Sequence, residues 1–444
     1  MNLREELQKR DLLYQFTSEK LFDLYDQGGE KFYCGYDPTA DSLHLGHLLT
    51  IMTAVNFMKR GNTFVMLIGG ATGFIGDPTG KTDARIFIDE AQLHHNQESI
   101  SRQIQQFMKN LNKMTGKELK VEFVNNYDFV KNMSIFDFFT QIGKYITVNT
   151  MLTKESIKKR IEDPDLSLSF TEFSYMLLQG YDFLYLNENQ DVKLQIGGSD
   201  QRGNMVTGTE MIRKKLGGEQ ECYVMTIPLM LDSTGKKFGK SEGNAVWLDP
   251  QRNTPYFVYQ FFMNTMDVDV PMYLKAFTLM ELGEIDQIIT EHQSSPELRF
   301  GQQKLASYVV EMIFGHDASV QAEKISKVLF GEPLSILQTI TPDEIRALGD
   351  EIGSTQMIGD NTRILDLLVN SNLASSNAEA KKLILAGSVF FNEQKITDIQ
   401  KEIKKSDLIS GIGLLRKGKK SYKLILWTNF QAKCTTEANS VDKN

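Results

Sequence analysis

The sequence contains few of the residues that mark several classes of protein. It has three cysteines in 444 residues, Cys34, Cys222 and Cys434, which are too few and too scattered for a disulfide framework or a zinc site. No apolar run approaches the roughly 20 residues that a membrane-spanning helix needs. The N-terminus, MNLREELQKRDLLYQF, lacks the hydrophobic core of a signal peptide. We therefore expect a protein of a reducing compartment, the cytoplasm, with no membrane partner.

The composition is that of a folded chain with more than one domain. Apolar residues make up 41% of the sequence and 27 residues are Phe, which excludes wholesale disorder. At about 100–200 residues per domain, the length predicts two to four domains.

The charge is distributed unevenly along the chain. The net charge is −8, yet residues 361–434 hold 13 Lys and Arg against 6 Asp and Glu. An acidic body with a basic C-terminal module indicates contact with RNA or DNA at that end. A solvated basic face remains the alternative.

Strands and helices alternate in the first 250 residues. The segments at 31–36 and 64–68 read as strands around a helix at 42–60, a right-handed βαβ unit. We predict further strands at 120–126, 193–198 and 221–229, with helices at 98–114 and 170–182. This order predicts an α/β doubly wound fold, whose ligands bind beyond the carboxyl ends of the strands.

The rest of the sequence is predicted to be mainly helical, with strands only near its end. Residues 251–330 contain helices at 254–263, 279–293 and 296–314, and residues 331–360 form a linker with a helical turn. A last unit at 361–430 has helices at 363–370 and 378–386, then short strands at SVFFN and YKLILW. A polar tail follows at 431–444.

The first candidate site is DPTADSLHLGH at 37–47, between the first strand and its helix. Helix N-termini bind phosphate because their amides are unpaired and the helix dipole is positive there. His44 and His47 share one helical face and can offer N–H donors to a phosphoryl oxygen, while Gly46 lets a nucleotide lie against the backbone. In the alternative, Gly46 merely packs and His47 is a core or surface residue.

Two other segments carry candidate binding groups. KKFGKS at 236–241 lies in a glycine-bracketed loop, where Lys237 and Lys240 can close over phosphates and stabilise a leaving pyrophosphate. QIGGSDQ at 195–201 follows a strand and places Asp200 where a carboxylate binds ribose hydroxyls. The alternatives are a solvated loop and an ordinary strand-to-helix turn capped by Asp200.

Together these segments resemble the two signatures of the class I aminoacyl-tRNA synthetases. YCGYDPTADSLHLGH (33–47), GGATGFIGDPTGK (69–81), FTEFSYMLLQGYDFL (170–184) and QIGGSDQ (195–201) narrow the resemblance to the bacterial-type tyrosyl-tRNA synthetases. The resemblance implies a Rossmann-like catalytic domain at 1–250 with an insertion and the KFGKS loop, a helical domain at 251–330, and an S4-like α+β RNA-binding domain at 361–430.

The resemblance implies an enzyme that activates L-tyrosine with ATP and then transfers tyrosine to the 3′-terminal adenosine of tRNA(Tyr). The substrate carboxylate attacks the α-phosphorus, so the enzyme supplies position and countercharge rather than a nucleophile. Mg²⁺ is expected to arrive with ATP, with no metal held by the protein and no zinc. A homodimer, with tRNA spanning both subunits, is also implied.

The resemblance assigns roles to individual residues. Tyr33 and Asp182 would bind the phenolic hydroxyl, because a phenol both donates and accepts. Asp77, Tyr175 and Gln179 would hold the ammonium group, and Gln201 would lie near the reacting carboxylate. The ATP site would comprise Cys34, Gly35, Asp37, Gly46, Thr50, Gly198, Asp200 and Lys240. The transition state would be stabilised by His44, His47, Thr39, Lys237 and Lys240, with Lys81 and Arg85 on the pyrophosphate side.

Some features depart from the family pattern or leave other functions open. Arg202 stands where many relatives have Trp, so its contact is open. The alternative functions are a tryptophanyl relative, a small-molecule adenylyltransferase and an RNA-binding scaffold without activity. Tyr33 with Asp182 argues against an indole substrate, because an indole cannot accept a hydrogen bond. The S4-like module and the presence of His44, His47, Lys237 and Lys240 argue against the other two.

Overall fold

The computed structural model describes residues 1–77, 89–163, 168–241, 244–330, 337–338, 340–357, 359–418 and 421–427. Contacts divide the chain into two compact units. The first unit comprises residues 1–253 and 261–315, and the second comprises residues 254–260 and the chain from 316 onward. Lys81, Arg85 and the predicted tail at 431–444 lie outside the described residues.

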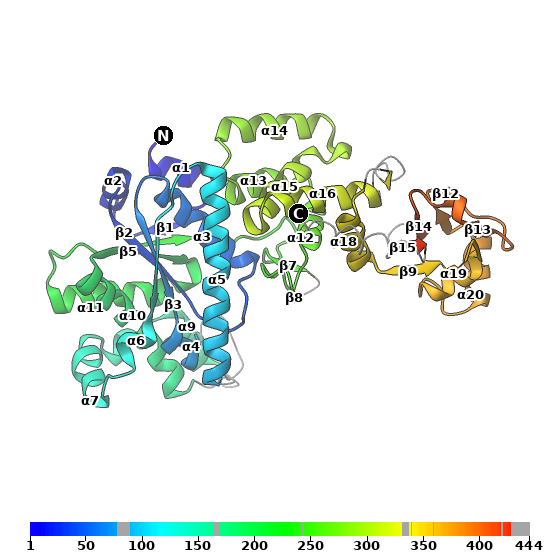
Figure 1. Ribbon diagram of the computed structural model, residues 1–444. Helices are drawn as coiled ribbons and strands as arrows, with labels where there is room; N and C mark the ends of the chain where they lie inside the picture. The colour runs from blue at the N-terminus through cyan, green and yellow to red at the C-terminus, as the bar shows by residue number, and fades with distance from the viewer. Residues whose placement is uncertain are drawn as a thin grey trace, which may run out of the picture. The chain divides into compact units, whose positions relative to one another are not determined.

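A six-stranded sheet forms the centre of the first unit (Figure 1). Its strands lie in the order β1 (Gln15–Phe16), β6 (Tyr223–Ile227), β5 (Val192–Gly198), β2 (Lys31–Tyr36), β3 (Thr63–Ile68) and β4 (Val121–Asn125). The strands from β6 to β4 are parallel, and β1 pairs with β6 in the antiparallel direction. The five predicted strands are therefore confirmed, whereas the two-residue β1 carries too little pattern to be predicted.

The order of the strands reverses at β2. From β2 the chain passes through α3 (Leu45–Met58) to β3 and later to β4, while β5 and β6 lie on the other side of β2. Such a reversal leaves a crevice beyond the carboxyl ends of the two strands that flank it. The segments that follow β2 and β5, residues 37–47 and 199–201, therefore border this crevice.

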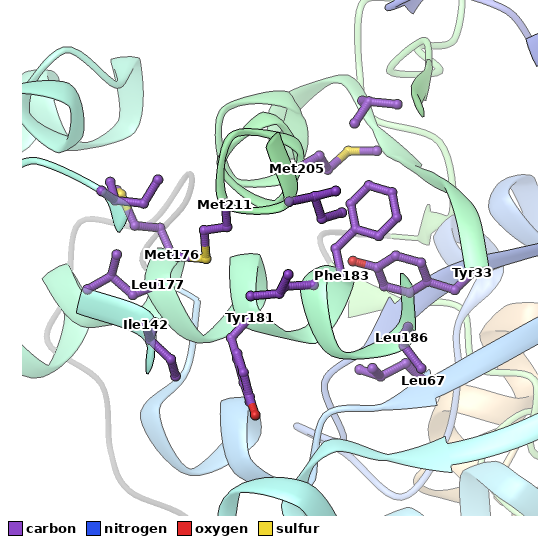
Figure 2. Close-up of a cluster of buried hydrophobic side chains, with 14 of the residues drawn as sticks. Tyr33, Leu67, Ile142, Met176, Leu177, Tyr181, Phe183, Leu186, Met205 and Met211 are labelled. Atoms are coloured by element: carbon purple, nitrogen blue, oxygen red, sulfur yellow. The ribbon is translucent and has the colours of Figure 1, made fainter. Parts of the chain in front are cut away.

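Alternate residues of the central strands face different layers of helices. On one face, the rings of Phe32 and Phe64 stack with centroids 5.3 Å apart, and Phe57 of α3 lies 4.9 Å from Phe32. On the other face, Tyr33 and Val65 belong to a buried cluster with side chains of α10 (Phe170–Gln190) and α11 (Arg202–Leu216), part of which Figure 2 shows. Because strand side chains alternate, Tyr33 lies on the same side of the sheet as α10.

Other helices complete the first unit. The long helix α5 (Glu90–Thr115) covers the prediction at 98–114, and α15 (Phe300–Phe314) packs beside it. The predicted helix at 279–293 is α14 (Leu282–Ser294). The predicted helix at 254–263 is α12 (Pro255–Met263), whose residues up to 260 belong to the second unit. The remaining helices are α1 (Leu3–Lys9), α2 (Lys20–Gln27), α4 (Gly70–Ile75), α6 (Asn126–Val130), α7 (Ile135–Asp137), α8 (Val148–Leu152), α9 (Glu155–Glu162) and α13 (Val270–Phe277).

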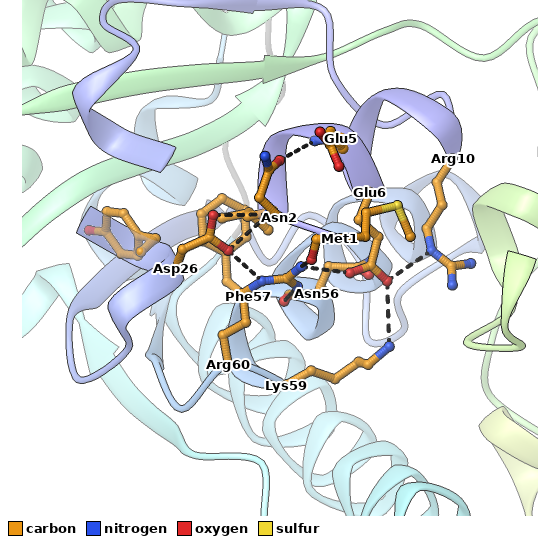
Figure 3. A network of polar contacts seen from close by, with 12 residues as sticks. Met1, Asn2, Glu5, Glu6, Arg10, Asp26, Asn56, Phe57, Lys59 and Arg60 are labelled. Carbon is orange, nitrogen blue, oxygen red and sulfur yellow. Dashed lines mark hydrogen bonds and ion pairs between the residues drawn. The ribbon is translucent and has the colours of Figure 1, made fainter. Parts of the chain in front are cut away.

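Glu6 is the centre of a polar network that ties the N-terminal helix to the first unit (Figure 3). Its carboxylate contacts Arg60 at 2.9 Å and Arg10 at 3.2 Å. Burial raises the pKa of Glu6, but Lys59, Arg60 and Arg10 together outweigh burial and lower the pKa below its ordinary value. Arg10 also donates to three backbone carbonyls at and beyond the end of α13, those of Lys275, Thr278 and Met280.

The second unit contains a five-stranded sheet and a small strand pair. The sheet order is β12 (Gln394–Lys395), β11 (Val389–Phe391), β14 (Ile412–Lys417), β15 (Ser421–Trp427) and β9 (Ser354–Met357). The pair is β10 (Asn361–Arg363) with β13 (Glu402–Lys404), and the helices are α16 (His316–Phe330), α18 (Pro342–Ile352), α19 (Ile364–Asn370) and α20 (Asn377–Leu385). The predicted α+β character of residues 361–430 is confirmed over the residues described there.

The stretch from 331 to 360 has more structure than the predicted linker with a helical turn. It contains α18, whose N-terminus is closed by a capping box between Thr341 and Glu344, and β9, which pairs with β15 in the parallel direction. The division of the chain at residues 250, 330, 360 and 430 stays a prediction. Among the described residues, no helix is both long and apolar enough to span a membrane.

Candidate active site

A cavity of about 470 Å³ lies at the crevice beside β2 and β5. Predicted site residues line much of it: Tyr33, Cys34, Gly35, Asp37, Thr39, His44, Gly46, His47, Thr50, Asp77, Tyr175, Gln179, Asp182, Gly198, Asp200, Gln201 and Lys237. Of Lys240 only the backbone is described, in the short strand β7 (Lys240–Ser241), and Lys81 and Arg85 lie outside the described residues. Segments far apart in the sequence thus meet at the predicted place.

Tyr33 and Asp182 supply buried polar groups to the cavity, with 1% and 3% of their surfaces exposed. Burial, and to a smaller extent the Asp37 charge, raises the pKa of Asp182 well above its ordinary value. Burial and then the Asp182 charge raise the pKa of the Tyr33 phenol. Within the described part of the chain, the Tyr33 hydroxyl has no hydrogen-bond partner. A buried polar group without a partner costs about 1–3 kcal/mol, so a ligand that bonds to this hydroxyl is favoured.

A chain of hydrogen bonds joins Asp37 to Asp182. The Asp37 carboxylate accepts from the Tyr175 hydroxyl at 2.8 Å and from the Thr72 hydroxyl at 2.6 Å. The Asn126 amide donates to Thr72 Oγ1 and to Asp182 Oδ2, both at 3.1 Å. The Asp37 carboxylate, predicted for ATP, is therefore bonded to a residue predicted for tyrosine, and its role stays a prediction.

A second group of amides lies around Asp77. Gln201 Nε2 donates to Asp77 Oδ2 at 2.6 Å, and Gln179 Nε2 donates to Gln201 Oε1 at 3.5 Å. Gln179 Oε1 is buried without a hydrogen-bond partner in the described chain. Tyr175, Gln179 and Asp182 come from one face of α10, as their spacing predicted.

The two histidines of the H-L-G-H segment are stacked at the N-terminus of α3. Their ring centroids lie 3.8 Å apart with 25° between the planes. His44 Nδ1 accepts from the backbone N–H of Gly46 at 3.0 Å, and His47 Nδ1 accepts from the backbone N–H of His44 at 3.2 Å. Because each Nδ1 is an acceptor, this hydrogen-bond network assigns the proton of each neutral imidazole to Nε2. Burial and the neighbouring His44 lower the pKa of His47 well below its ordinary value, which favours this neutral form.

Glycines allow the two signature segments to approach each other. A Cβ at Gly46 would lie 2.8 Å from His44 Cε1, and a Cβ at Gly239 would lie 3.0 Å from the backbone nitrogen of Gly46. Gly239 also has a φ of +84°, which side-chain-bearing residues rarely adopt. The KFGKS loop therefore rests directly against the start of α3.

An aromatic cluster holds the KFGKS loop at Phe238. Its ring stacks on Phe277 with centroids 4.5 Å apart and meets Tyr273 edge-on at 4.8 Å. At the base of the loop, Ser233 donates from its backbone and its hydroxyl to Asp269. Lys237 is exposed and lines the cavity, as a group that closes over phosphates requires.

The predicted nucleotide side of the cavity includes a buried thiol, a hydroxyl, glycines and the carboxylates of Asp37 and Asp200. Burial raises the pKa of the Cys34 thiol to about 12, so the thiol stays protonated at neutral pH. Thr50 Oγ1 lies 2.8 Å from the Tyr36 hydroxyl, and its own hydroxyl donates to the His47 carbonyl at 2.8 Å. A Cβ at Gly198 would lie 2.6 Å from Asp200 Oδ1, so glycine lets this carboxylate fold back to the crevice.

The family of the chain follows from comparison with known proteins. Residues 27–331 match the family model described as "tRNA synthetases class I (W and Y)", and residues 344–425 match that of the "Tyrosine--tRNA ligase SYY-like C-terminal domain". The tyrosine–tRNA ligase of Streptococcus agalactiae serotype V is 43% identical over 425 residues, which cover 95% of this chain and 99% of that protein. This chain belongs to the tyrosine–tRNA ligases. The resemblance deduced from the motifs is thereby confirmed, and the C-terminal match separates the chain from the tryptophanyl alternative.

A second curated ligase and two solved structures agree with this assignment. The Streptococcus suis tyrosine–tRNA ligase is 41% identical over 430 residues, covering 96% of this chain and 100% of its own. The C-terminally truncated mitochondrial tyrosyl-tRNA synthetase of Coccidioides posadasii is 31% identical with a TM-score of 0.65, over 73% of this chain and 91% of its own. The C-terminally truncated mitochondrial enzyme of Aspergillus nidulans is 28% identical with a TM-score of 0.67, over 74% of this chain and 94% of its own. The predicted activity of a class I tyrosine–tRNA ligase is therefore confirmed.

The sequence predicted no role for Thr72 or Asn126 in the tyrosine–tRNA ligase cavity region, and none for Gln195 beyond its place in the QIGGSDQ segment. Thr72 and Gln195 line the cavity, and Asn126 bonds to Asp182. Gln195 is buried on β5 opposite Tyr33, and its Oε1 has no partner among the described residues. Asn126 and Thr72 follow β4 and β3, so their place after the carboxyl ends of parallel strands was the signal that could have found them.

Some basic side chains of the C-terminal unit contact aromatic rings or backbone carbonyls, and others are exposed without such a contact being described. The Arg416 guanidinium lies over the Phe390 ring at 3.9 Å, and Lys417 donates to the Leu373 carbonyl at 2.8 Å. Lys405 lies over the Trp427 ring at 3.4 Å. Lys381, Lys382 and Lys404 are exposed, while Lys419 and Lys420 lie outside the described residues.

The other basic residues singled out in the sequence lie along α11. Lys215 forms an ion pair with Glu188 at 2.7 Å and Lys214 with Glu210 at 2.7 Å, whereas Arg213 is exposed. Arg202 is exposed at the start of the helix. Burial, and in smaller part Arg202, lowers the pKa of Lys154 against the opposing charge of Glu210.

Proposed function

We propose that Tyr33 and Asp182 select tyrosine by its phenolic hydroxyl. The observation that carries this assignment is the buried Tyr33 hydroxyl without a partner in the described chain, beside a buried carboxyl in the same cavity. The substrate hydroxyl donates to the Asp182 carboxylate and accepts from the Tyr33 hydroxyl. A phenylalanine ring leaves both protein groups buried and unpaired, which disfavours its binding.

The ammonium group of the substrate is proposed to bind Asp77, Tyr175 and Gln179. An ammonium has three N–H donors, and these residues supply three acceptors. Asp77 offers a carboxylate, and Gln179 offers a buried Oε1. The Tyr175 hydroxyl donates to Asp37 and keeps lone pairs for the ammonium. Gln201, which bonds to Asp77, is then placed near the substrate carboxylate.

Adenylate formation is proposed to use the Nε2–H groups of His44 and His47. The tyrosine carboxylate oxygen attacks the α-phosphorus of ATP, the bond to the bridging oxygen breaks, and pyrophosphate leaves with the electron pair. Neutral imidazole donors and the hydroxyl of Thr39 bind the phosphoryl oxygens. Lys237 and Lys240, with Lys81 and Arg85, neutralise the charge that develops on pyrophosphate.

ATP is proposed to lie along the glycine-bordered side of the cavity. Its contacts are assigned to Cys34, Gly35, Asp37, Gly46, Thr50, Gly198, Asp200 and Lys240. Magnesium enters with the triphosphate, whose oxygens are its preferred ligands. The described residues hold no cluster of three or more His, Cys, Asp or Glu that could bind a metal, and the expectation of no zinc stays a prediction.

In the second step, the terminal adenosine of tRNA(Tyr) attacks the adenylate through a ribose hydroxyl, which forms an ester and releases AMP. The exposed lysines of the C-terminal unit are proposed to hold the RNA backbone. The cytoplasm, where ATP and tRNA are supplied, remains the proposed location.

A homodimer is proposed from the exposed apolar residues of the segment 135–170. Phe136 and Phe170 expose 78% and 72% of their surfaces, and Ile135, Phe139 and Val148 are also exposed. Such an apolar surface is typical of a protein interface. A second copy of this chain is the proposed occupant, because symmetric dimers are the commonest soluble oligomers.

Pyrophosphate exchange with ATP tests the substrate assignment. The wild-type chain should exchange with tyrosine and not with phenylalanine or tryptophan. In the Tyr33→Phe variant, the ratio of kcat/KM for tyrosine to that for phenylalanine should fall by about tenfold or more, because the substrate phenol then has only Asp182 as a partner. An unchanged ratio would remove Tyr33 from the recognition of the phenol.

A further inference from the structure

Through three hydrogen bonds, Gln103 of α5 joins the H-L-G-H segment to the stretch 246–249, which follows the KFGKS loop. Its Oε1 accepts from the backbone N–H of Leu43 at 3.0 Å. Its Nε2 donates to Ser42 Oγ at 3.0 Å and to Asp249 Oδ2 at 3.2 Å. Ser42 and Leu43 immediately precede His44, and Asp249 follows the KFGKS loop and its return strand β8 (Asn244–Ala245).

The H-L-G-H segment and the stretch 246–249 are also paired along their backbones. The Leu248 N–H donates to the Leu43 carbonyl at 2.8 Å, and the Leu45 N–H donates to the Val246 carbonyl at 2.9 Å. The Val246 N–H in turn donates to the Gly239 carbonyl at 2.9 Å. A shift of residues 246–249 therefore moves both the entry to α3 and the base of the lysine loop.

The Trp247 ring, which belongs to the stretch 246–249, contacts the ring of His44. The two rings meet edge-on with centroids 5.9 Å apart, and the Arg252 guanidinium covers the Trp247 ring at 4.7 Å. Arg252 also forms an ion pair with Asp41, four residues before Leu45 begins α3. His44 thus rests on side chains from the segment that Gln103 holds.

We propose that Gln103 is a positioning residue for adenylate formation, which sets the place of His44 relative to the lysine loop. This proposal rests on the proposed roles of His44, Lys237 and Lys240. Gln103 is absent from the lining of the tyrosine and ATP cavity, so it acts through the segments that it binds. A donor displaced by about 1 Å can cost a hundredfold in rate, whereas the phenol and ammonium contacts of tyrosine lie on β2, α10 and the segment near Asp77.

Because the donor and the acceptor of each bond are known, a second substitution at Asp249 can compensate for a substitution of Gln103. In Gln103→Glu, one carboxylate oxygen still accepts from the Leu43 N–H, but the other faces the Asp249 carboxylate and repels it. In the double variant Gln103→Glu/Asp249→Asn, the new side-chain amide at position 249 donates to that oxygen and restores the hydrogen bond between positions 103 and 249. Its remaining oxygen can still accept from the Gln251 N–H, which Asp249 binds at 2.7 Å in the wild-type chain. The contact with Ser42 is kept when the Ser42 hydroxyl, which donates to the Leu43 carbonyl in the wild-type chain, turns to donate to the carboxylate at position 103.

The experiment measures tyrosine-dependent pyrophosphate exchange by the full-length protein, together with the KM for tyrosine. Gln103→Ala and Gln103→Glu should lower kcat by about tenfold to a hundredfold and change the KM for tyrosine by less than about twofold. The double variant should recover most of kcat. Gln105→Ala, an exposed glutamine on the same helix, should behave as wild type.

The outcomes separate this proposal from the proposed function. Wild-type kcat in both single variants would overturn the positioning role while leaving the substrate assignment intact. No exchange with tyrosine in the wild-type chain would overturn the proposed function itself. If Gln103→Glu lowers thermal stability, the double variant distinguishes a structural role from a positioning role. A double variant that recovers stability but does not recover kcat contradicts the proposal.

Discussion

The Asn126 side-chain amide donates a hydrogen bond of 3.1 Å to Asp182, and both residues are buried. The orientation of this amide is fixed because its oxygen accepts from the backbone N–H of Ala71 at 2.7 Å. The NH₂ group must therefore face Asp182 and Thr72. The hydrogen bond opposes the rise in the pKa of Asp182 but does not cancel the effect of burial.

Replacing Asp182 by Asn should stabilise the protein near neutral pH. A carboxyl whose pKa is raised in the folded state resists ionisation there, whereas the unfolded chain ionises at a pH of about 3.9. The buried carboxyl therefore lowers the free energy of unfolding. This loss of stability is absent below a pH of about 3.9 and grows as the pH rises toward the folded pKa. The thermal midpoint of Asp182→Asn should exceed that of the wild type near pH 8, and the gain should shrink as the pH approaches about 4.

The same substitution should weaken tyrosine binding. A hydrogen bond to a charged group is worth about 1.5–3 kcal/mol, so its removal should raise the KM for tyrosine by about tenfold to a hundredfold. Glu188→Gln, on the same helix and paired with Lys215, serves as a control for the loss of an acid. A variant that is less stable near pH 8 yet binds tyrosine normally would contradict both expectations.

Replacing Gly46 by Ala should slow adenylate formation without unfolding α3. Alanine is the better helix former by about 1 kcal/mol, but its Cβ would lie 2.8 Å from His44 Cε1 and displace that ring. We expect kcat for pyrophosphate exchange to fall by about tenfold or more, while tyrosine affinity, measured by calorimetry, changes by less than about twofold.

Gly203→Ala is the matched control for this experiment. Gly203 also lies in the first turn of a helix, yet a Cβ there would meet Lys154 Cδ only at 3.8 Å, an ordinary contact. If both alanine variants lose the same activity, a clash with His44 is not the cause.

The sequence was informative where a pattern is local. Alternating strands and helices predicted the parallel sheet, and the H-L-G-H and KFGKS segments predicted one cavity between residues nearly 200 positions apart. The helical spacing of Tyr175, Gln179 and Asp182 predicted their shared face. Each of these predictions depends on periodicity or on the rule that ligands bind at strand ends.

The sequence did not predict the features that depend on contacts between residues far apart in the chain. Asn126 looks like an ordinary loop residue until Ala71 and Asp182 are placed beside it. Gln103 is one of several glutamines on α5, and only its contacts with Leu43 and Asp249 distinguish it. The strand β9 has four residues, and its pairing with β15 decides that the stretch around it is more than a linker.

Substitution of an exposed aromatic residue should test the proposed dimer. Phe136→Glu places a charge on a side chain that is 78% exposed, so the folded monomer should tolerate it while a dimer that buries this ring should not. Sedimentation velocity over a range of protein concentrations should show more monomer than for the wild type. Leu298→Glu, at a residue that is 65% exposed outside the segment 135–170, should leave the dimer unchanged.

Removal of exposed lysines from the C-terminal unit should affect tRNA charging alone. The triple variant Lys381→Ala/Lys382→Ala/Lys404→Ala removes charges that are exposed in the structure. If these lysines bind phosphates, the KM for tRNA should rise and its dependence on salt should flatten, by a slope of about 0.7–0.9 for each phosphate that is no longer neutralised. Pyrophosphate exchange needs no RNA and should be unchanged.

A matched triple variant separates specific contacts from overall charge. Lys20, Lys109 and Lys113 are exposed lysines of the first unit, and their replacement by Ala changes the net charge by the same amount. If the protein bound RNA only through its total charge, both triple variants would change the KM for tRNA and its salt dependence equally. Because phosphate contacts act within about 10 Å at ordinary salt, an RNA interface on the C-terminal unit requires that only the first triple variant flatten the salt dependence.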